Sequence, residues 1–128
     1  MKRLLMLTPA LVLAMSGQAQ KLSGTWIIAN YETARPGQEN VKVSNIGSII
    51  FKKGNSGEKN ISYSVLGNNV EDKTPFTYQT HEDYITVSSD GSALNKTWIM
   101  VQKSKKYQKW YSTDGANSVQ ILELRKQP

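Results

Sequence analysis

The side chains in this sequence best suited to binding chemistry are aromatic and sulfur-containing residues that alternate with polar ones along short runs. Alternation of this kind places successive side chains on opposite faces of a strand, so that one face of each run is apolar. Aromatic rings offer a small ligand a large contact area at low entropic cost. Burial in a core is the ordinary fate of such residues in a small domain, so core filling is the competing interpretation. The candidate ligand-binding residues are Tyr63, Phe76, Tyr78, Trp98, Met100, Trp110 and Tyr111.

Catalytic and metal chemistry has little support in the sequence. The single histidine, His81, precedes Glu82 and Asp83, but the chain has no cysteine and no glycine-rich elbow that would present a nucleophilic serine. One histidine alone does not make a zinc site of the usual type. We therefore predict no enzyme activity, no metal and no cofactor. Both the segment around His81 and the stretch 71–73 are interpreted as polar loops.

A group of lysines lies close to aromatic residues in the last third of the chain. Cations beside rings could hold phosphate and stack bases, as barrels that bind nucleic acids do. Lysines at a hairpin tip more often stay solvated and discourage edge-to-edge pairing of strands. We therefore predict that the protein does not bind nucleic acid. The lysines concerned are Lys96, Lys103, Lys105, Lys106 and Lys109.

The first residues have the organisation of a removable signal peptide. Lys2 and Arg3 precede an uncharged, mostly apolar run from Leu4 to Met15, which is shorter than the roughly 20 residues that span a bilayer. Small residues just before position 20 predict a signal peptide over residues 1–19 and a single mature domain over residues 20–128. Removal of the two basic residues lowers the formal net charge of +6 by two. The mature protein is expected to be exported, either to a periplasm or out of the cell, with no stable membrane insertion.

Strand signals dominate the expected mature domain. Alternating runs are separated by clusters of Gly, Asn, Ser, Asp and Lys, a spacing typical of an all-β sandwich or barrel. Sequential strands joined by tight turns form a meander, and a meander of about eight strands can close on itself. We predict an eight-stranded antiparallel up-and-down barrel, with a two-sheet sandwich as the alternative. The expected runs cover residues 24–31, 46–53, 59–65, a short piece around Val70, 76–79, 85–87, 96–103, 107–113 and 119–126.

The start of the first run carries a family resemblance. The stretch Leu22–Trp26 resembles the Gly-x-Trp signature with which lipocalins begin their barrel. In that family the Trp closes one end of the barrel and stacks near an Arg from the end of the last strand, and Arg125 is the position that matches. The mature chain as a whole is similar to the short lipocalin-like domains of exported bacterial proteins. The resemblance implies a calycin-type barrel in which Gly24, Trp26 and Arg125 are structural closers.

These features together predict an exported, monomeric lipocalin-like protein that binds a small, partly apolar molecule in its barrel. The alternative is an interaction or accessory protein whose barrel is filled. Such a protein would act through the lysine-bearing hairpin or through a long loop from Glu32 to Val43. A third hypothesis is a barrel enzyme that uses His81 with Glu82 or Asp83.

Overall fold

The structure is a computed structural model that describes residues 22–113 and 117–128. The expected signal peptide lies outside the described residues. Within the described part of the chain, no helix is both long and apolar enough to cross a lipid bilayer. The described ranges form nine β-strands, which are β1 (Gly24–Ala34), β2 (Val41–Lys52), β3 (Ser56–Val65), β4 (Asn68–Asp72), β5 (Phe76–Thr80), β6 (Tyr84–Ser88), β7 (Thr97–Lys103), β8 (Tyr107–Thr113) and β9 (Val119–Lys126).

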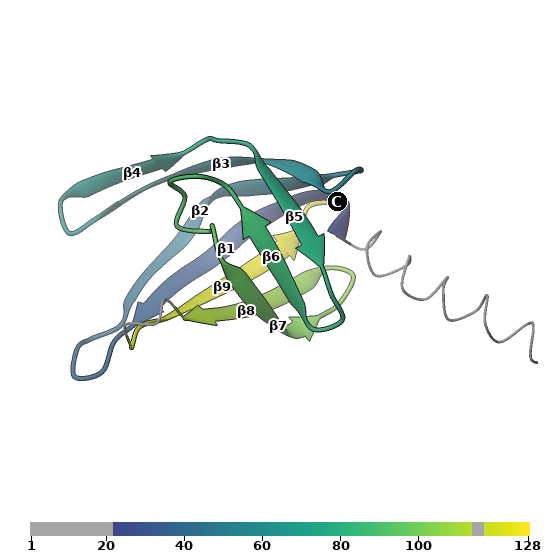
Figure 1. The fold of residues 1–128 in the computed structure, drawn as a ribbon. Helices are drawn as coiled ribbons and strands as arrows, with labels where there is room; N and C mark the ends of the chain where they lie inside the picture. Colours follow the sequence, from purple (N-terminus) through teal and green to yellow (C-terminus); the bar gives the residue numbers. More distant parts are fainter. Residues whose placement is uncertain (1–21, 114–116) are drawn as a thin grey trace, which may run out of the picture.

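The strands form one antiparallel sheet whose two ends meet. Neighbouring strands follow the order β2-β1-β9-β8-β7-β6-β5-β3-β4, and an additional pairing of β2 with β3 closes the sheet into a barrel. The first and last described strands, β1 and β9, are neighbours. Figure 1 shows the tilted strands round the barrel, with the β3–β4 hairpin extending beyond one end. The predicted closed up-and-down barrel is confirmed, and the sandwich alternative is wrong.

Strands β4 and β5 form one barrel strand with a break in it. Their partners on β3 follow a single register, from Val65 opposite Asn68 to Ser56 opposite Thr77. The ladder lapses at residues 73–75, where proline at position 75 has no N–H to donate. The nine strands therefore occupy eight positions round the barrel, as the sequence predicts.

The first hairpin is longer than the sequence predicts. Strand β1 continues to Ala34 and β2 begins at Val41, so the expected long loop shrinks to residues 35–40. Glu32 pairs with Lys42 inside this extension. Backbone hydrogen bonds need no apolar side chains, so a polar stretch that looks like a loop in sequence continues the ladder. The expected long loop from Glu32 to Val43 is therefore a short turn between two paired strands.

Two glycines allow the strands at the closure of the barrel to approach each other. Gly47 on β2 has a φ of 142°, and a Cβ there would lie 1.9 Å from the carbonyl oxygen of Asn60 on β3. A Cβ at Gly57 on β3 would lie 2.3 Å from the ring of Phe76 on β5. A side chain at either position would force the strands apart, so glycine is required for the contacts that close the barrel.

Candidate ligand-binding site

Five of the seven candidate ligand-binding residues fill one half of the barrel interior. The ring of Phe51 on β2 contacts three of them edge to face, with centroids 5.5 Å from Phe76, 5.1 Å from Tyr78 and 6.1 Å from Trp110. Such arrangements combine apolar burial with favourable ring electrostatics. In this half the side chains belong to one packed hydrophobic core. The five residues, each at most 8% exposed, are Phe76, Tyr78, Trp98, Met100 and Trp110.

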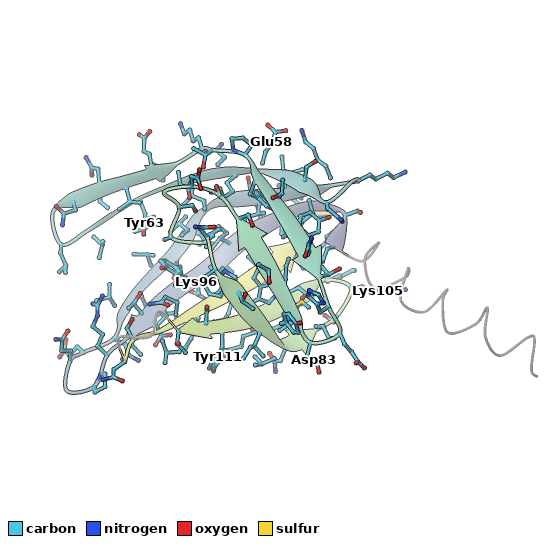
Figure 2. All side chains as sticks on the ribbon, in the orientation of Figure 1. Glu58, Tyr63, Asp83, Lys96, Lys105 and Tyr111 are labelled. Atoms are coloured by element: carbon cyan, nitrogen blue, oxygen red, sulfur yellow. The ribbon has the colours of Figure 1, made fainter. Side chains whose placement is uncertain are left out.

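Tyr111 faces away from the interior. It directly follows the buried Trp110 on β8, and successive side chains of a strand point to opposite faces. Its ring lies 5.7 Å from the ammonium of Lys109, and its strand partner on β7 is the exposed Ile99. Figure 2 shows Tyr111 on the outside of the barrel. Tyr111 therefore does not line the interior.

Trp26 closes the end of the barrel at which strand β1 begins. It is 0% exposed, and its indole Nε1 donates to the carbonyl oxygen of Leu22 at 2.9 Å. The cation over its ring is Lys126, whose Nζ lies 5.0 Å from the ring centroid. Arg125 is exposed on the outer face, which corrects the expected role of that residue. Gly24, with a φ of 116°, leaves room for the lysine, because a Cβ would meet its Nζ at 2.9 Å.

The other half of the interior contains a cavity of about 270 Å³. Four strands and the β6–β7 connection supply its apolar wall. Of the seven sequence candidates, Tyr63 on β3 is the one that lines this cavity. It belongs to the β3–β4 hairpin, at the opposite end of the barrel from Lys105 (Figure 2). The apolar wall consists of Ile28, Ile46, Ile61, Leu94 and Leu122, and the rim includes Tyr31, Tyr63, Val70, Asp72, Lys73, Thr74 and Asp90.

Two tyrosines form an aromatic pair in the lining of the cavity. The rings of Tyr31 and Tyr63 meet edge to face, with centroids 6.4 Å apart and planes at 65°. Burial raises the pKa of Tyr63, and the nearby charge of Asp72 raises it further, so the phenol stays neutral. No described residue forms a hydrogen bond with the Tyr63 hydroxyl, which leaves it available to a ligand.

A charged pair lies next to the cavity. Lys59 on β3 points inward, and its Nζ lies 3.0 Å from each carboxylate oxygen of Asp72 on β4. The lysine side chain is 0% exposed and that of Asp72 is 14% exposed. Lys59 also donates to the Ser89 hydroxyl at 2.8 Å. The pair occupies the region where the ladder between β3 and the β4–β5 strand lapses.

Hydrogen bonds hold the Asp72 carboxylate in its charged form. Ser92 donates to it at 2.5 Å and the Thr74 hydroxyl at 2.9 Å. Burial by itself would raise the pKa of Asp72, but the hydrogen bonds from Ser92, Lys59 and Thr74, together with the lysine charge, lower it below its ordinary value. The carboxylate at the edge of the cavity is therefore ionised at neutral pH.

The sequence prediction missed this pair although one signal was available. Lys59 has the same parity along its strand as Ile61 and Tyr63, which were expected on the buried face, so alternation alone turns it inward. Asp72 was expected in a polar loop because its neighbours Glu71 and Lys73 are charged. Its position opposite Ile61 on β3 decides that it faces the interior.

The lysines expected near the aromatic residues do not form a single surface. Lys96 turns inward, with its Nζ 5.2 Å from the Trp98 ring and 2.6 Å from the Gln120 side-chain oxygen. Lys103 and Lys105 belong to the exposed β7–β8 hairpin. The structure thus separates Lys96 from the lysines of this hairpin.

His81 lies in the turn between β5 and β6 and does not line the cavity. Its ring stacks on that of Tyr84, with centroids 4.3 Å apart and planes at 18°. Among residues 22–113 and 117–128, no group of three or more histidine, aspartate or glutamate side chains is placed to hold a metal ion. The hypothesis of a histidine-dependent enzyme gains no geometric support from this arrangement.

Comparisons with known proteins give a match in fold and none in sequence. No protein-family model matches this chain, and no curated protein matches it significantly. Among solved structures, the siderocalin Ex-FABP, described as functioning through dual ligand specificities, is 13% identical with a TM-score of 0.51. That match covers 84% of this chain and 74% of the siderocalin. A complex of bovine odorant-binding protein with undecanal is 15% identical with a TM-score of 0.51, covering 84% of this chain and 72% of the other.

Sequence identities as low as 13% and 15% show a similarity in fold and nothing about function. The closed eight-position meander, the tryptophan plug at one end and the cavity at the other are present in the structure itself. In fold, this chain is a closed antiparallel β-barrel similar to those of lipocalins.

Proposed function

We propose that this protein is exported and holds one small, partly apolar molecule in the open half of its barrel. The observation that carries the proposal is the cavity of about 270 Å³, whose inner wall consists of aliphatic side chains. Sites for drug-sized ligands measure about 300–1,000 Å³, so this cavity suits a ligand at or below the small end of that range. Burial of apolar ligand surface against the wall supplies most of the binding free energy, at about 25 cal/mol per Å².

The structural relatives support a binding role over a catalytic one. One is described by its dual ligand specificities and the other was solved with undecanal. In this proposal the protein acts as a monomer without cofactor or nucleic acid. Of the sequence candidates, Tyr63 contacts the ligand, whereas the five buried residues form the packed core that closes the far side of the barrel.

Narrowing the cavity should weaken ligand binding. Val70 lines the cavity and pairs with Tyr63 across the β3–β4 hairpin, so Val70→Trp places a large ring in the ligand space. Asn69→Trp adds the same ring on the exposed face of the same strand and serves as the matched control. In titrations with a polarity-sensitive fluorescent dye, we expect Val70→Trp to weaken binding at least about tenfold, equivalent to 1.4 kcal/mol, and Asn69→Trp to leave it unchanged. Equal dye affinity of both variants would place the dye outside the cavity and contradict the proposal.

Export is tested separately. The full-length protein is expressed in a bacterial host, and the N-terminus of the protein recovered outside the cytoplasm is determined by mass spectrometry. Cleavage after Ala19 predicts that the recovered chain begins at Gln20. Retention of the intact chain in the cytoplasm would contradict the export part of the proposal and leave the binding part standing.

A further inference from the structure

We propose that the cavity selects a ligand with a cationic ammonium group on a short apolar body, in preference to one with a carboxylate group. This inference rests on the proposed binding function and adds the charge of the ligand to it. The preference for a cation follows from the charged and aromatic side chains that line the rim of the cavity.

The first argument is the unequal exposure of the two members of the buried pair. Asp72 lines the cavity and its side chain is 14% exposed, whereas that of Lys59 is 0% exposed and does not line the cavity. The formal charges cancel, but a ligand atom in the cavity lies closer to the carboxylate than to the ammonium behind it. Because the interaction of charges falls with distance and is weakly screened in a partly buried site, the near field is negative.

The remaining charged residues of the rim do not reverse this sign. Lys73 and Asp90 both line the cavity and both are exposed, so their formal charges cancel and water screens them. Glu71 also borders the cavity, but it alternates with Val70 and Asp72 and is exposed, so water screens its negative charge. Asp72 is therefore the charged group that a ligand meets in a partly desolvated position.

The second argument is the aromatic pair beside Asp72. Tyr31 and Tyr63 both line the cavity, with ring centroids 6.4 Å apart. The face of an aromatic ring attracts a cation within about 6 Å of its centroid, and such rings recognise ammonium groups in other proteins. The Tyr63 hydroxyl has no described hydrogen-bond partner, and its oxygen accepts a hydrogen bond from an N–H donor. An ammonium group thus finds two aromatic rings, a phenol oxygen and a carboxylate in the lining of one cavity.

The apolar wall of the cavity offers a binding surface for the apolar part of the ligand. Ile28, Ile46 and Leu122 line the cavity away from the charged rim and are each at most 5% exposed. A short alkyl chain placed there removes apolar surface from water. The ligand class that satisfies both ends is a small alkylamine or a related organic cation.

The test uses three probes of one chain length that differ in the head group: octylamine, 1-octanol and octanoate. Each competes at pH 7 with the fluorescent dye bound to the wild-type protein. At this pH the amine is protonated and the acid is ionised. We expect octylamine to bind at least about tenfold more tightly than octanoate, with octanol between them. Val70→Trp should weaken octylamine binding, which ties the effect to the cavity rather than to exposed carboxylates.

Variants show whether Asp72 sets the preference. In Lys59→Met/Asp72→Asn both charges are removed, so no buried charge is left unpaired, and the ratio of the octanoate and octylamine dissociation constants should fall towards one. Asp83→Asn removes an exposed carboxylate, 78% exposed, and should leave the ratio unchanged. Thermal unfolding followed by circular dichroism checks that each variant is folded, and the wild-type ranking decides the matter if the double variant is not.

The outcomes separate the two proposals. Octanoate binding as tight as octylamine, or tighter, overturns the cationic preference and leaves the binding function in place. An unchanged ratio in the folded double variant overturns the assignment to Asp72. Failure of all three probes to displace the dye, with no dye affinity lost in Val70→Trp, overturns the binding function itself.

Discussion

Replacement of Asp72 by alanine is expected to lower the free energy of unfolding by about 3 kcal/mol. The substitution leaves the ammonium of Lys59 without a counter-charge, and that side chain is 0% exposed. Removal of one member of a buried pair costs more than the pair contributes, because the remaining charge stays desolvated. Urea denaturation at pH 7, with the midpoint and slope fitted together, measures the change.

Two further variants make the measurement specific. Asp83 faces Lys103 at 3.7 Å in an exposed pair, with the aspartate side chain 78% exposed, so Asp83→Ala should cost less than about 1 kcal/mol. Lys59→Met combined with Asp72→Ala should recover most of the loss, since no unpaired charge remains inside. A loss in Asp72→Ala no larger than in Asp83→Ala would mean that water in the cavity solvates the lysine, and it would contradict the desolvation argument.

The same pair predicts how wild-type stability responds to acid. The hydrogen bonds from Ser92, Lys59 and Thr74 and the lysine charge hold the pKa of Asp72 in the folded protein below that of an ordinary aspartate, which is about 3.9. The stability contributed by the ionised carboxylate is therefore fully present above about pH 4 and is lost as the pH falls through the lower pKa of the folded state. In Lys59→Met/Asp72→Ala this part of the acid dependence should disappear.

Replacement of Trp98 by alanine is expected to lower the free energy of unfolding by about 3–5 kcal/mol. Trp98 is 0% exposed, and its ring centroid lies 6.3 Å from that of Trp110. Its indole Nε1 donates to the Leu94 carbonyl oxygen at 3.1 Å, a bond that also holds the β6–β7 connection beside the cavity. The substitution removes apolar burial and a buried hydrogen bond, and it leaves a void that strands on all sides cannot fill.

The neighbour on the same strand provides the control. Ile99 is 55% exposed, so Ile99→Ala should change the free energy of unfolding by less than about 1 kcal/mol. Urea denaturation of both variants measures the difference. Comparable losses at the two positions would mean that Trp98 does not carry the packing of the interior, in conflict with its burial.

The order and approximate limits of the strands could be predicted because alternation is a local property. Ile61 and Tyr63 turn inward while Ser62 and Ser64 turn out, as their spacing requires. Closure of the meander was also predictable, since a small sheet without disulfide bonds leaves no edge exposed if it closes. The extension of the first hairpin was not, because pairing of Glu32 with Lys42 depends on backbone hydrogen bonds that leave no mark in side-chain polarity.

Two residues were assigned to the wrong face of their strand, each because the prediction was one position out along the chain. Arg125 was expected over Trp26, where the register places Lys126. Tyr111 was expected inside next to Trp110, although adjacent residues of a strand cannot both face inward. In each case the expected residue lies on the opposite face of its strand, and its neighbour in the chain faces inward. Leu122 and Leu124 are both buried, so the two-residue period of the strand places Lys126 on the same inward face.

The sequence by itself determined the fold of this protein, because strand alternation and turn residues act within a few positions along the chain. Only the tertiary structure decided which half of the barrel is packed and which is hollow. That division depends on the volumes of side chains brought together from strands far apart, such as Phe51 and Trp110 on one side and Tyr31 and Tyr63 on the other. The sign of the charge at the cavity is set in the same way, by the relative depth of Asp72 and its lysine, which only the closed barrel specifies.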